Sequence, residues 1–146
     1  MPTIKIFTDG ASRGNPGYAG IGIVIYDEND FIIATYKEFI GEATNNQAEY
    51  KAAIKSLDVL KKLRSEGEVS FDSIEFYSDS ELLVNQITFD YQVKEPGLAL
   101  LNNKFHVLIK KLSIPFEICY IERSKNKNAD KLANLAIDNK LKKTIA

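Results

Sequence analysis

The sequence predicts an α/β fold in which an antiparallel hairpin leads into parallel strands joined by helices. Two short apolar runs with the same pattern, residues 4–9 and 74–79, each end in a hydroxyl residue followed by an aspartate. Runs of this kind fit strands that are buried on both faces of a parallel pair. A polar segment at residues 27–30 separates two further apolar runs, which is typical of a hairpin. Because functional groups in open α/β sheets gather beyond the carboxyl ends of strands, we expect Asp9 and Asp79 to lie side by side.

The other elements follow from turn signals and apolar periodicity. Residues 10–20 contain four glycines and a proline and are predicted to form a loop. Thr44 and Gln47 have the spacing of a capping box, which predicts the start of a long helix. In chain order we predict strands at residues 3–9, 21–26 and 31–39, a helix at about 44–64, a strand at 73–78, helices at 80–88 and 98–112, a strand at 116–121, a loop at 122–127, and a helix from Asn128 to about Lys140.

Composition excludes several classes of protein. A chain of 146 residues is large enough for one domain with a substantial core, and we expect that domain to span residues 1–146. No apolar run approaches the ~20 residues of a membrane span, so no membrane partner is expected. The single cysteine, Cys119, cannot form an internal disulfide and is expected to be a buried small hydrophobic residue. These features predict a cytoplasmic protein, and the absence of a heptad seam predicts a monomer.

Two more acids occupy unusual positions on predicted helices. Glu49 shares an apolar stripe with Ala53 and Leu57, and Asp130 shares one with Ala133. An ionised acid on a buried stripe is costly unless it is paired or binds a metal. For either residue alone, favourable interaction with the helix dipole is an equally good explanation. The predicted fold brings both acids to the edge that carries the strand-terminal aspartates, which favours a site made of four acids.

Four converging carboxylates without a histidine or cysteine cluster form a site of hard oxygen ligands. Such ligands suit Mg²⁺ or Mn²⁺ rather than zinc. A carboxylate-rich site can hold two ions ~4 Å apart, which is an arrangement used in phosphoryl transfer. A glycosidase would need only two carboxylates and no metal.

Charge is unevenly distributed along the chain. Residues 1–100 contain 9 basic and 16 acidic residues, whereas residues 101–146 contain 10 basic and 4 acidic residues. The basic part could contact phosphates. The alternative, which charge alone favours, is a solvated helix face, and we interpret the basic segment at residues 140–143 in that way.

Four motifs resemble the type 1 ribonuclease H family. They are TDGASRGNPG at residues 8–17, TNNQAEY at 44–50, YSDSELL at 77–83 and NADKLAN at 128–134. The resemblance extends from Thr8 to about Ala136. It implies a ribonuclease H-like fold, with a five-stranded mixed sheet in which the first three strands form an antiparallel meander, the last two run parallel to the first, and helices cover both faces.

The resemblance also implies an activity and a metal site. It implies a metal-dependent endonuclease that hydrolyses the RNA strand of RNA–DNA hybrids and leaves 5′-phosphate and 3′-hydroxyl ends. It implies that two Mg²⁺ ions, for which Mn²⁺ can substitute, are bound by Asp9, Glu49, Asp79 and Asp130.

Distinguishing RNA from DNA requires contacts with 2′-hydroxyl groups in a wide minor groove. Uncharged donors and acceptors that flank the four acids are the candidates. Turn formation by Asn15 and helix capping by Thr44 and Gln47 are alternative roles, and both roles can hold together. The predicted substrate-binding residues are Gly10, Ser12, Asn15, Thr44, Asn46, Gln47 and Ser80.

The sequence departs from the family pattern at two places. Many members carry a histidine in the loop before the last aspartate, but residues 122–127 contain none, and His106 is predicted to be structural. We hypothesise that Arg123 assists turnover instead, while Lys125 and Lys127 are alternative phosphate contacts. Some members also insert a basic protrusion where this chain has residues 91–100 with only Lys94, so few cationic contacts with the hybrid are expected.

Two alternatives remain beside this interpretation. One is a related nuclease of the same broad fold, such as a transposase-like or double-strand RNA-cutting enzyme, which usually carries additional domains. Double-stranded RNA is accordingly a second candidate substrate. The other is a hybrid-binding module without catalysis, in which family acids have been lost. The presence of all four acids counts against the module.

Overall fold

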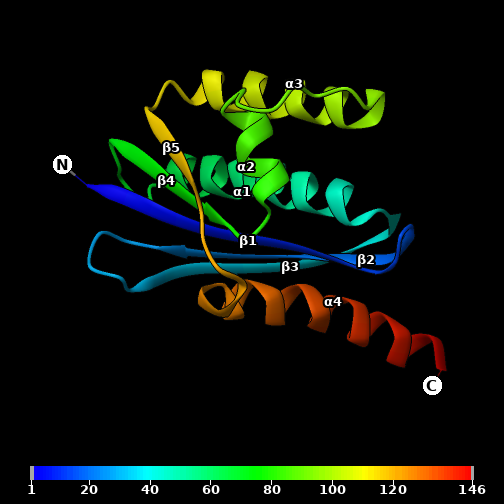
Figure 1. Ribbon diagram of the computed structural model, residues 1–146. Helices are drawn as coiled ribbons and strands as arrows, with labels where there is room; N and C mark the ends of the chain where they lie inside the picture. The colour runs from blue at the N-terminus through cyan, green and yellow to red at the C-terminus, as the bar shows by residue number, and fades with distance from the viewer. Residues whose placement is uncertain (1, 146) are drawn as a thin grey trace.

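The computed structural model describes residues 2–145 and contains a five-stranded mixed sheet with helices on both faces, as predicted (Figure 1). The strand order is β3-β2-β1-β4-β5; β2 is antiparallel to β1 and β3, while β4 is parallel to β1 and β5. None of the helices in the described part has the length and apolar character needed to cross a membrane. The elements are β1 (Thr3–Gly14), β2 (Gly17–Tyr26), β3 (Ile32–Ala43), α1 (Asn45–Ser65), β4 (Ser73–Ser78), α2 (Glu81–Ile87), α3 (Pro96–Leu112), β5 (Phe116–Tyr120), the 3₁₀ helix η1 (Arg123–Lys125) and α4 (Lys127–Ile145).

The helices divide between the two faces of the sheet (Figure 1). α1 packs on β1 and β2, α3 packs on α1, and α4 covers β2, β3 and β1 from the opposite side. The main core lies between the sheet and α1–α3, where apolar side chains of alternating strand positions meet the apolar stripes of the helices. Because β1 and β4 are parallel neighbours, their carboxyl ends meet at one edge of the sheet.

The predicted loop at residues 10–20 is wrong, because almost all of it is strand. β1 continues to Gly14 and β2 begins at Gly17, so only two residues, Asn15 and Pro16, connect them; their peptide bond is cis. Gly14 and Gly17 flank this turn, but Gly10 is not a turn residue. A Cβ atom on Gly10 would lie 2.3 Å from the backbone carbon of Ala48 in α1, so glycine is needed for close packing there.

Side-chain burial on β1 and β4 also differs from the prediction of strands buried on both faces. Alternate residues are only partly covered, because α4 lies over β2 rather than over β4 and β5. On this less covered face, the ring of Phe7 stacks on Tyr77 at a centroid distance of 4.7 Å. Cys119, expected to be buried, is the β5 partner of Tyr77 and is only half-buried.

The segment before the last helix is more ordered than the predicted loop, because it contains η1. α4 begins at Lys127, one residue before the predicted cap Asn128, and extends to Ile145. Within the basic segment at residues 140–143, the Lys140 amine lies 5.8 Å from the centroid of the Phe39 ring. The side chain of Lys143 lies outside the described residues.

Candidate active site

Three carboxylates converge at the carboxyl end of the parallel strands. Asp9 comes from β1, Glu49 from α1, and Asp79 directly follows β4. One oxygen atom from each lies within 4.8 Å of the others. Asp9 is 4% exposed and Glu49 is 9% exposed, so both acids are buried at the floor of the site. The sequence prediction that strand topology brings Asp9 and Asp79 together is confirmed.

The contact between β1 and α1 orients Glu49. The Gly10 amide donates a hydrogen bond of 2.6 Å to Oε1 of Glu49. The absence of a side chain on Gly10 allows the helix backbone to approach the strand at this point. Glu49 lies on the buried, otherwise apolar stripe of α1. Its side chain therefore points from the helix toward the sheet edge instead of toward solvent.

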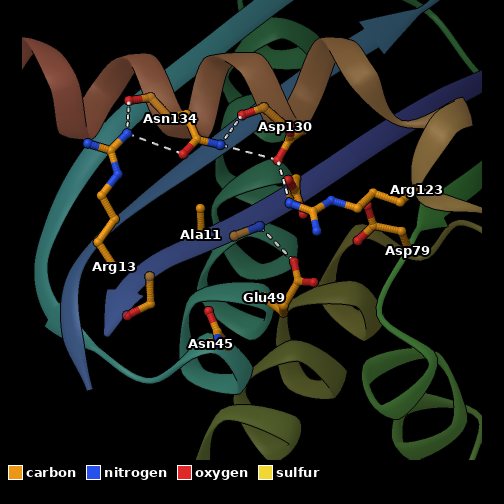
Figure 2. A pocket seen from close by; sticks show the side chains of 11 residues that line it. Ala11, Arg13, Asn45, Glu49, Asp79, Arg123, Asp130 and Asn134 are labelled. Atoms are coloured by element: carbon orange, nitrogen blue, oxygen red, sulfur yellow. Dashed lines mark hydrogen bonds and ion pairs between the residues drawn. The ribbon is translucent and has the colours of Figure 1, made fainter. Parts of the chain in front are cut away.

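Asp130 lies beside this group at the start of α4 and is more exposed, at 31% of its side chain. Its Oδ1 atom accepts a hydrogen bond from Nδ2 of Asn134 at 3.2 Å and lies 3.7 Å from Nη2 of Arg123. Asn134 in turn accepts a hydrogen bond from Arg13, and Arg13 pairs with Asp138 at 2.6 Å. Figure 2 shows this line of contacts from the end of β1 to the fourth acid.

The electrostatics of the three-acid group disfavour full ionisation. Burial, together with the charges of Glu49 and Asp79, raises the pKa of Asp9 to about 10. Burial and the charge of Asp79 raise the pKa of Glu49 to about 8, against the opposing effect of the Gly10 amide. The pKa of Asp79 is also raised, chiefly by burial. Buried oxygen ligands with uncompensated negative charge fit a hard divalent cation, which would relieve this repulsion.

A cavity of about 350 Å³ opens over the acids. All four predicted metal ligands and Arg123 line it, so the structure brings these five predicted site residues together. The complete lining consists of Asp9, Gly10, Ala11, Ser12, Arg13, Asn45, Glu49, Asp79, Arg123, Asp130 and Asn134.

The predicted substrate-binding residues divide into two groups. Gly10 and Ser12 line the cavity, but the other five do not. Thr44 and Gln47 form the predicted capping box of α1, with hydrogen bonds of 3.1 and 2.9 Å between each backbone amide and the other side chain. Asn15 accepts a hydrogen bond of 3.1 Å from the Asn45 amide.

The last two members of this group lie on helix starts. Asn46 is exposed in the first turn of α1. The Ser80 hydroxyl caps α2 by accepting a hydrogen bond from the Leu83 amide. The roles of these residues in substrate binding stay predictions.

Sequence reasoning missed four residues that line the cavity: Ala11, Arg13, Asn45 and Asn134. Asn134 lies one helical turn after Asp130, and this i, i+4 spacing was the signal that could have found it. Arg13 was assigned to a loop. A prediction that β1 continues past Asp9 to include Arg13 would have placed this residue near the site.

His106 does not line the cavity. It is half-buried on α3, and its ring stacks on Phe89 at a centroid distance of 4.7 Å. Burial lowers its pKa, which favours the neutral ring. These contacts agree with the prediction that His106 has a structural position.

Residues 7–136 match the family described as reverse transcriptase-like. The chain is 37% identical over 138 residues to ribonuclease HI of Halobacterium salinarum, covering 92% of this chain and 64% of the relative. It is 38% identical to a protein of Mycobacterium tuberculosis described as bifunctional, covering 92% of this chain but 35% of the relative. The chain thus spans less than two thirds of these curated relatives.

The chain also matches a solved structure over nearly its whole length. The crystal structure of LC11-RNase H1 in complex with an RNA/DNA hybrid superposes with a TM-score of 0.86. The two chains are 41% identical, and the match covers 94% of this chain and 99% of the other. The other protein was isolated from compost by a metagenomic approach.

Proposed function

Because this chain belongs to the type 1 ribonuclease H family, we propose that it hydrolyses the RNA strand of RNA–DNA hybrids. It acts as an endonuclease that leaves 5′-phosphate and 3′-hydroxyl ends. The observation that carries the proposal is the convergence of Asp9, Glu49 and Asp79 from three separate elements within 4.8 Å. The relative LC11-RNase H1, which has been solved with an RNA/DNA hybrid, supports the substrate class.

The carboxylates of Asp9, Glu49, Asp79 and Asp130 would hold two divalent ions, Mg²⁺ or Mn²⁺. When bound, such ions activate a water molecule and stabilise the leaving oxygen of a phosphodiester. The residues of this chain supply the geometry. Asp9 lies at the centre, in electrostatic contact with the other three acids. Glu49 is fixed by the Gly10 amide, and Asp130 is held at the rim of the cavity by Asn134.

Arg123 is the positive charge next to the acids, and Arg13 is a second cation of the cavity. The guanidinium of Arg123 lies 3.7 Å from Asp130, lines the cavity, and acts to lower the pKa values of Glu49 and Asp79. A guanidinium remains protonated near neutral pH, so it cannot take the place of a proton-transferring histidine. We propose that Arg123 instead contacts a phosphate and assists departure of the product.

Substrate recognition involves uncharged groups around the acids. Gly10 and Ser12 line the cavity, where 2′-hydroxyl groups would be contacted. Asn15, Thr44, Asn46, Gln47 and Ser80 stay proposed contacts farther along the hybrid. We also propose that residues 1–146 form one ribonuclease H domain, which works as a monomer in the cytoplasm.

The test is cleavage of three end-labelled substrates: an RNA–DNA hybrid, double-stranded RNA and double-stranded DNA. Each is incubated with Mg²⁺, Mn²⁺ or a chelator. We expect metal-dependent cleavage of the RNA strand of the hybrid, and its loss in Asp9→Asn. Arg123→Ala is expected to reduce steady-state turnover more than single-turnover cleavage, because the residue assists product departure.

The outcomes separate the alternatives. Equal cleavage of double-stranded RNA would widen the substrate class while keeping the mechanism. Tight hybrid binding without cleavage would contradict the proposed enzymatic activity and would indicate a hybrid-binding module. Full turnover by Arg123→Ala at saturating metal would remove that residue from the mechanism.

A further inference from the structure

Asn126 lies at the junction between η1 and α4, behind the acidic site. Its side chain is buried, with 1% of the residue exposed. Its backbone amide donates to the carbonyl of Arg123 at 3.0 Å, and its own carbonyl accepts from the amide of Asp130 at 3.1 Å. The backbone of this one residue therefore joins the segment that carries Arg123 to the helix that carries Asp130.

The side chain of Asn126 extends the junction to the sheet. Nδ2 donates a hydrogen bond of 2.9 Å to the carbonyl oxygen of Thr8, which is 118 positions earlier in the chain. Thr8 immediately precedes Asp9 and lies one residue beyond the last β1–β4 pair, Phe7 with Tyr77. Asn126 thus occupies the place where the two strands separate to deliver their aspartates.

The Asn126 side chain also acts on Asp79, where its hydrogen bonding opposes the rise in the Asp79 pKa that burial causes. The contacts of Asn126 consequently converge on three elements that carry site acids. They are the end of β1 before Asp9, the Asp79 carboxylate after β4, and the first turn of α4 at Asp130.

This arrangement has an energetic cost. Oδ1 of Asn126 is buried and has no hydrogen-bond partner among the described residues. A buried acceptor left without a partner is destabilising. The benefit lies in its donor, which bridges two segments that a purely apolar side chain would leave unlinked.

We propose that Asn126 is a positioning residue that sets the spacing of Asp9, Asp79 and Asp130 for metal binding. The proposal rests on the function proposed above, because it concerns the same acids. Groups that orient metal ligands without touching the metal typically contribute 10–100-fold to metal affinity. Removing the Asn126 donor is therefore expected to weaken Mg²⁺ binding by about 10–100-fold.

The test measures Mg²⁺ binding to the intact protein without nucleic acid. Backbone amide resonances of ¹⁵N-labelled protein are followed during titration, and the Gly10 amide reports on the site because it contacts Glu49. Asn126→Ala removes the whole link. Asn126→Leu keeps the approximate size of the side chain but removes the donor without adding a charge, and it serves if the alanine variant does not fold.

Asn102→Ala is the matched control. Asn102 is also buried, and its Nδ2 donates two hydrogen bonds of 3.2 Å, to the Tyr50 hydroxyl and the Gln86 carbonyl. It does not line the acidic cavity. Its loss is expected to lower the melting temperature while leaving the Mg²⁺ midpoint unchanged.

A midpoint raised in the Asn126 variants alone would support the positioning role. A folded Asn126 variant with the wild-type midpoint would overturn it. An equal rise in Asn102→Ala would also overturn it, because the effect would then be general loosening. Since no hybrid is present, these results are independent of whether the wild-type protein cleaves RNA.

Discussion

The surroundings of Asp9 destabilise the ionised form of its carboxyl group. It is buried, and the neighbouring Glu49 and Asp79 oppose its ionisation. The folded protein therefore holds a proton on Asp9 more tightly than the unfolded chain does. Above the ordinary pKa of 3.8, and up to the raised value of about 10, the free energy of unfolding falls as pH rises.

Asp9→Asn should stabilise the metal-free protein while abolishing cleavage. The amide takes up no proton on folding and so avoids this cost, and we expect a gain of about 1–3 kcal/mol at pH 8 and a smaller gain at pH 5. Thermal melts in chelator at both pH values measure the difference. Saturating Mg²⁺ should reverse the order of stability, because only the wild-type site binds the ion fully.

Asp138→Asn is the control for that experiment. Pairing with Arg13 lowers the pKa of Asp138, so its stabilising contribution is already complete at pH 5 and does not change up to pH 8. Its effect on melting should therefore be independent of pH in this range. A lower melting temperature for Asp9→Asn at pH 8 in chelator would contradict the account of the site.

Whether a single site residue could be predicted from the sequence depends on which part of the structure positions it. Asp9 and Asp79 were predictable because sheet topology alone brings the ends of adjacent parallel strands together. Glu49 was predictable from its place on an apolar stripe. The link from Asn126 to Thr8 was not, because it depends on a side-chain direction across 118 positions. Neither was the contact of Arg13 with Asn134, which requires β1 to continue past the acid.

At the scale of whole elements, the glycines were the main source of error in predicting where β1 ends and β2 begins. Glycine is as typical of close backbone approach as it is of turns, and the sequence does not distinguish the two. In β2, a Cβ atom on Gly22 would lie 2.1 Å from the carbonyl oxygen of Ala129 in α4. The absence of this side chain is what allows α4 to lie directly on the sheet.

Gly22→Ala should therefore destabilise the protein by displacing α4. The expected cost is about 1–3 kcal/mol, since the backbone of the helix must move to accommodate the methyl group. The measurement is urea unfolding, read as a lower midpoint with an unchanged slope. Because α4 carries Asp130, cleavage should also weaken.

Gly41→Ala separates steric clash from backbone strain. Gly41 has a φ angle of +78° and no atom near the position of an added Cβ, so alanine there carries only the conformational cost. It should lower stability without weakening cleavage. If Gly22→Ala left both stability and cleavage unchanged, the close contact with α4 would not be required.

For the molecule as a whole, charge distribution determines how a hybrid is held. The link between α2 and α3, residues 88–95, is short and contains one lysine, Lys94. The cavity contributes two more cations, Arg13 and Arg123, and both are already paired with acids. Affinity for the hybrid is therefore expected to depend on few new phosphate contacts.

The salt dependence of hybrid affinity should be shallow. With about three to five phosphate contacts, the slope of log K against log salt should be about −2.7 to −4.5. Hybrid affinity is measured by fluorescence anisotropy with the inactive Asp9→Asn variant, at salt concentrations between about 50 and 200 mM. A slope near −9, equivalent to about ten contacts, would contradict the expectation.

The position of α4 has a consequence for the protein during synthesis. Gly20 and Gly22 of β2 pack against this helix, and Asp130 belongs to it. While a ribosome is still translating residues before 127, β2 lacks its cover and the fourth acid does not yet exist. Domains generally fold as units during translation, so this domain cannot close its sheet before α4 has been made. The proposed cleavage activity would therefore require that α4 has emerged from the ribosome.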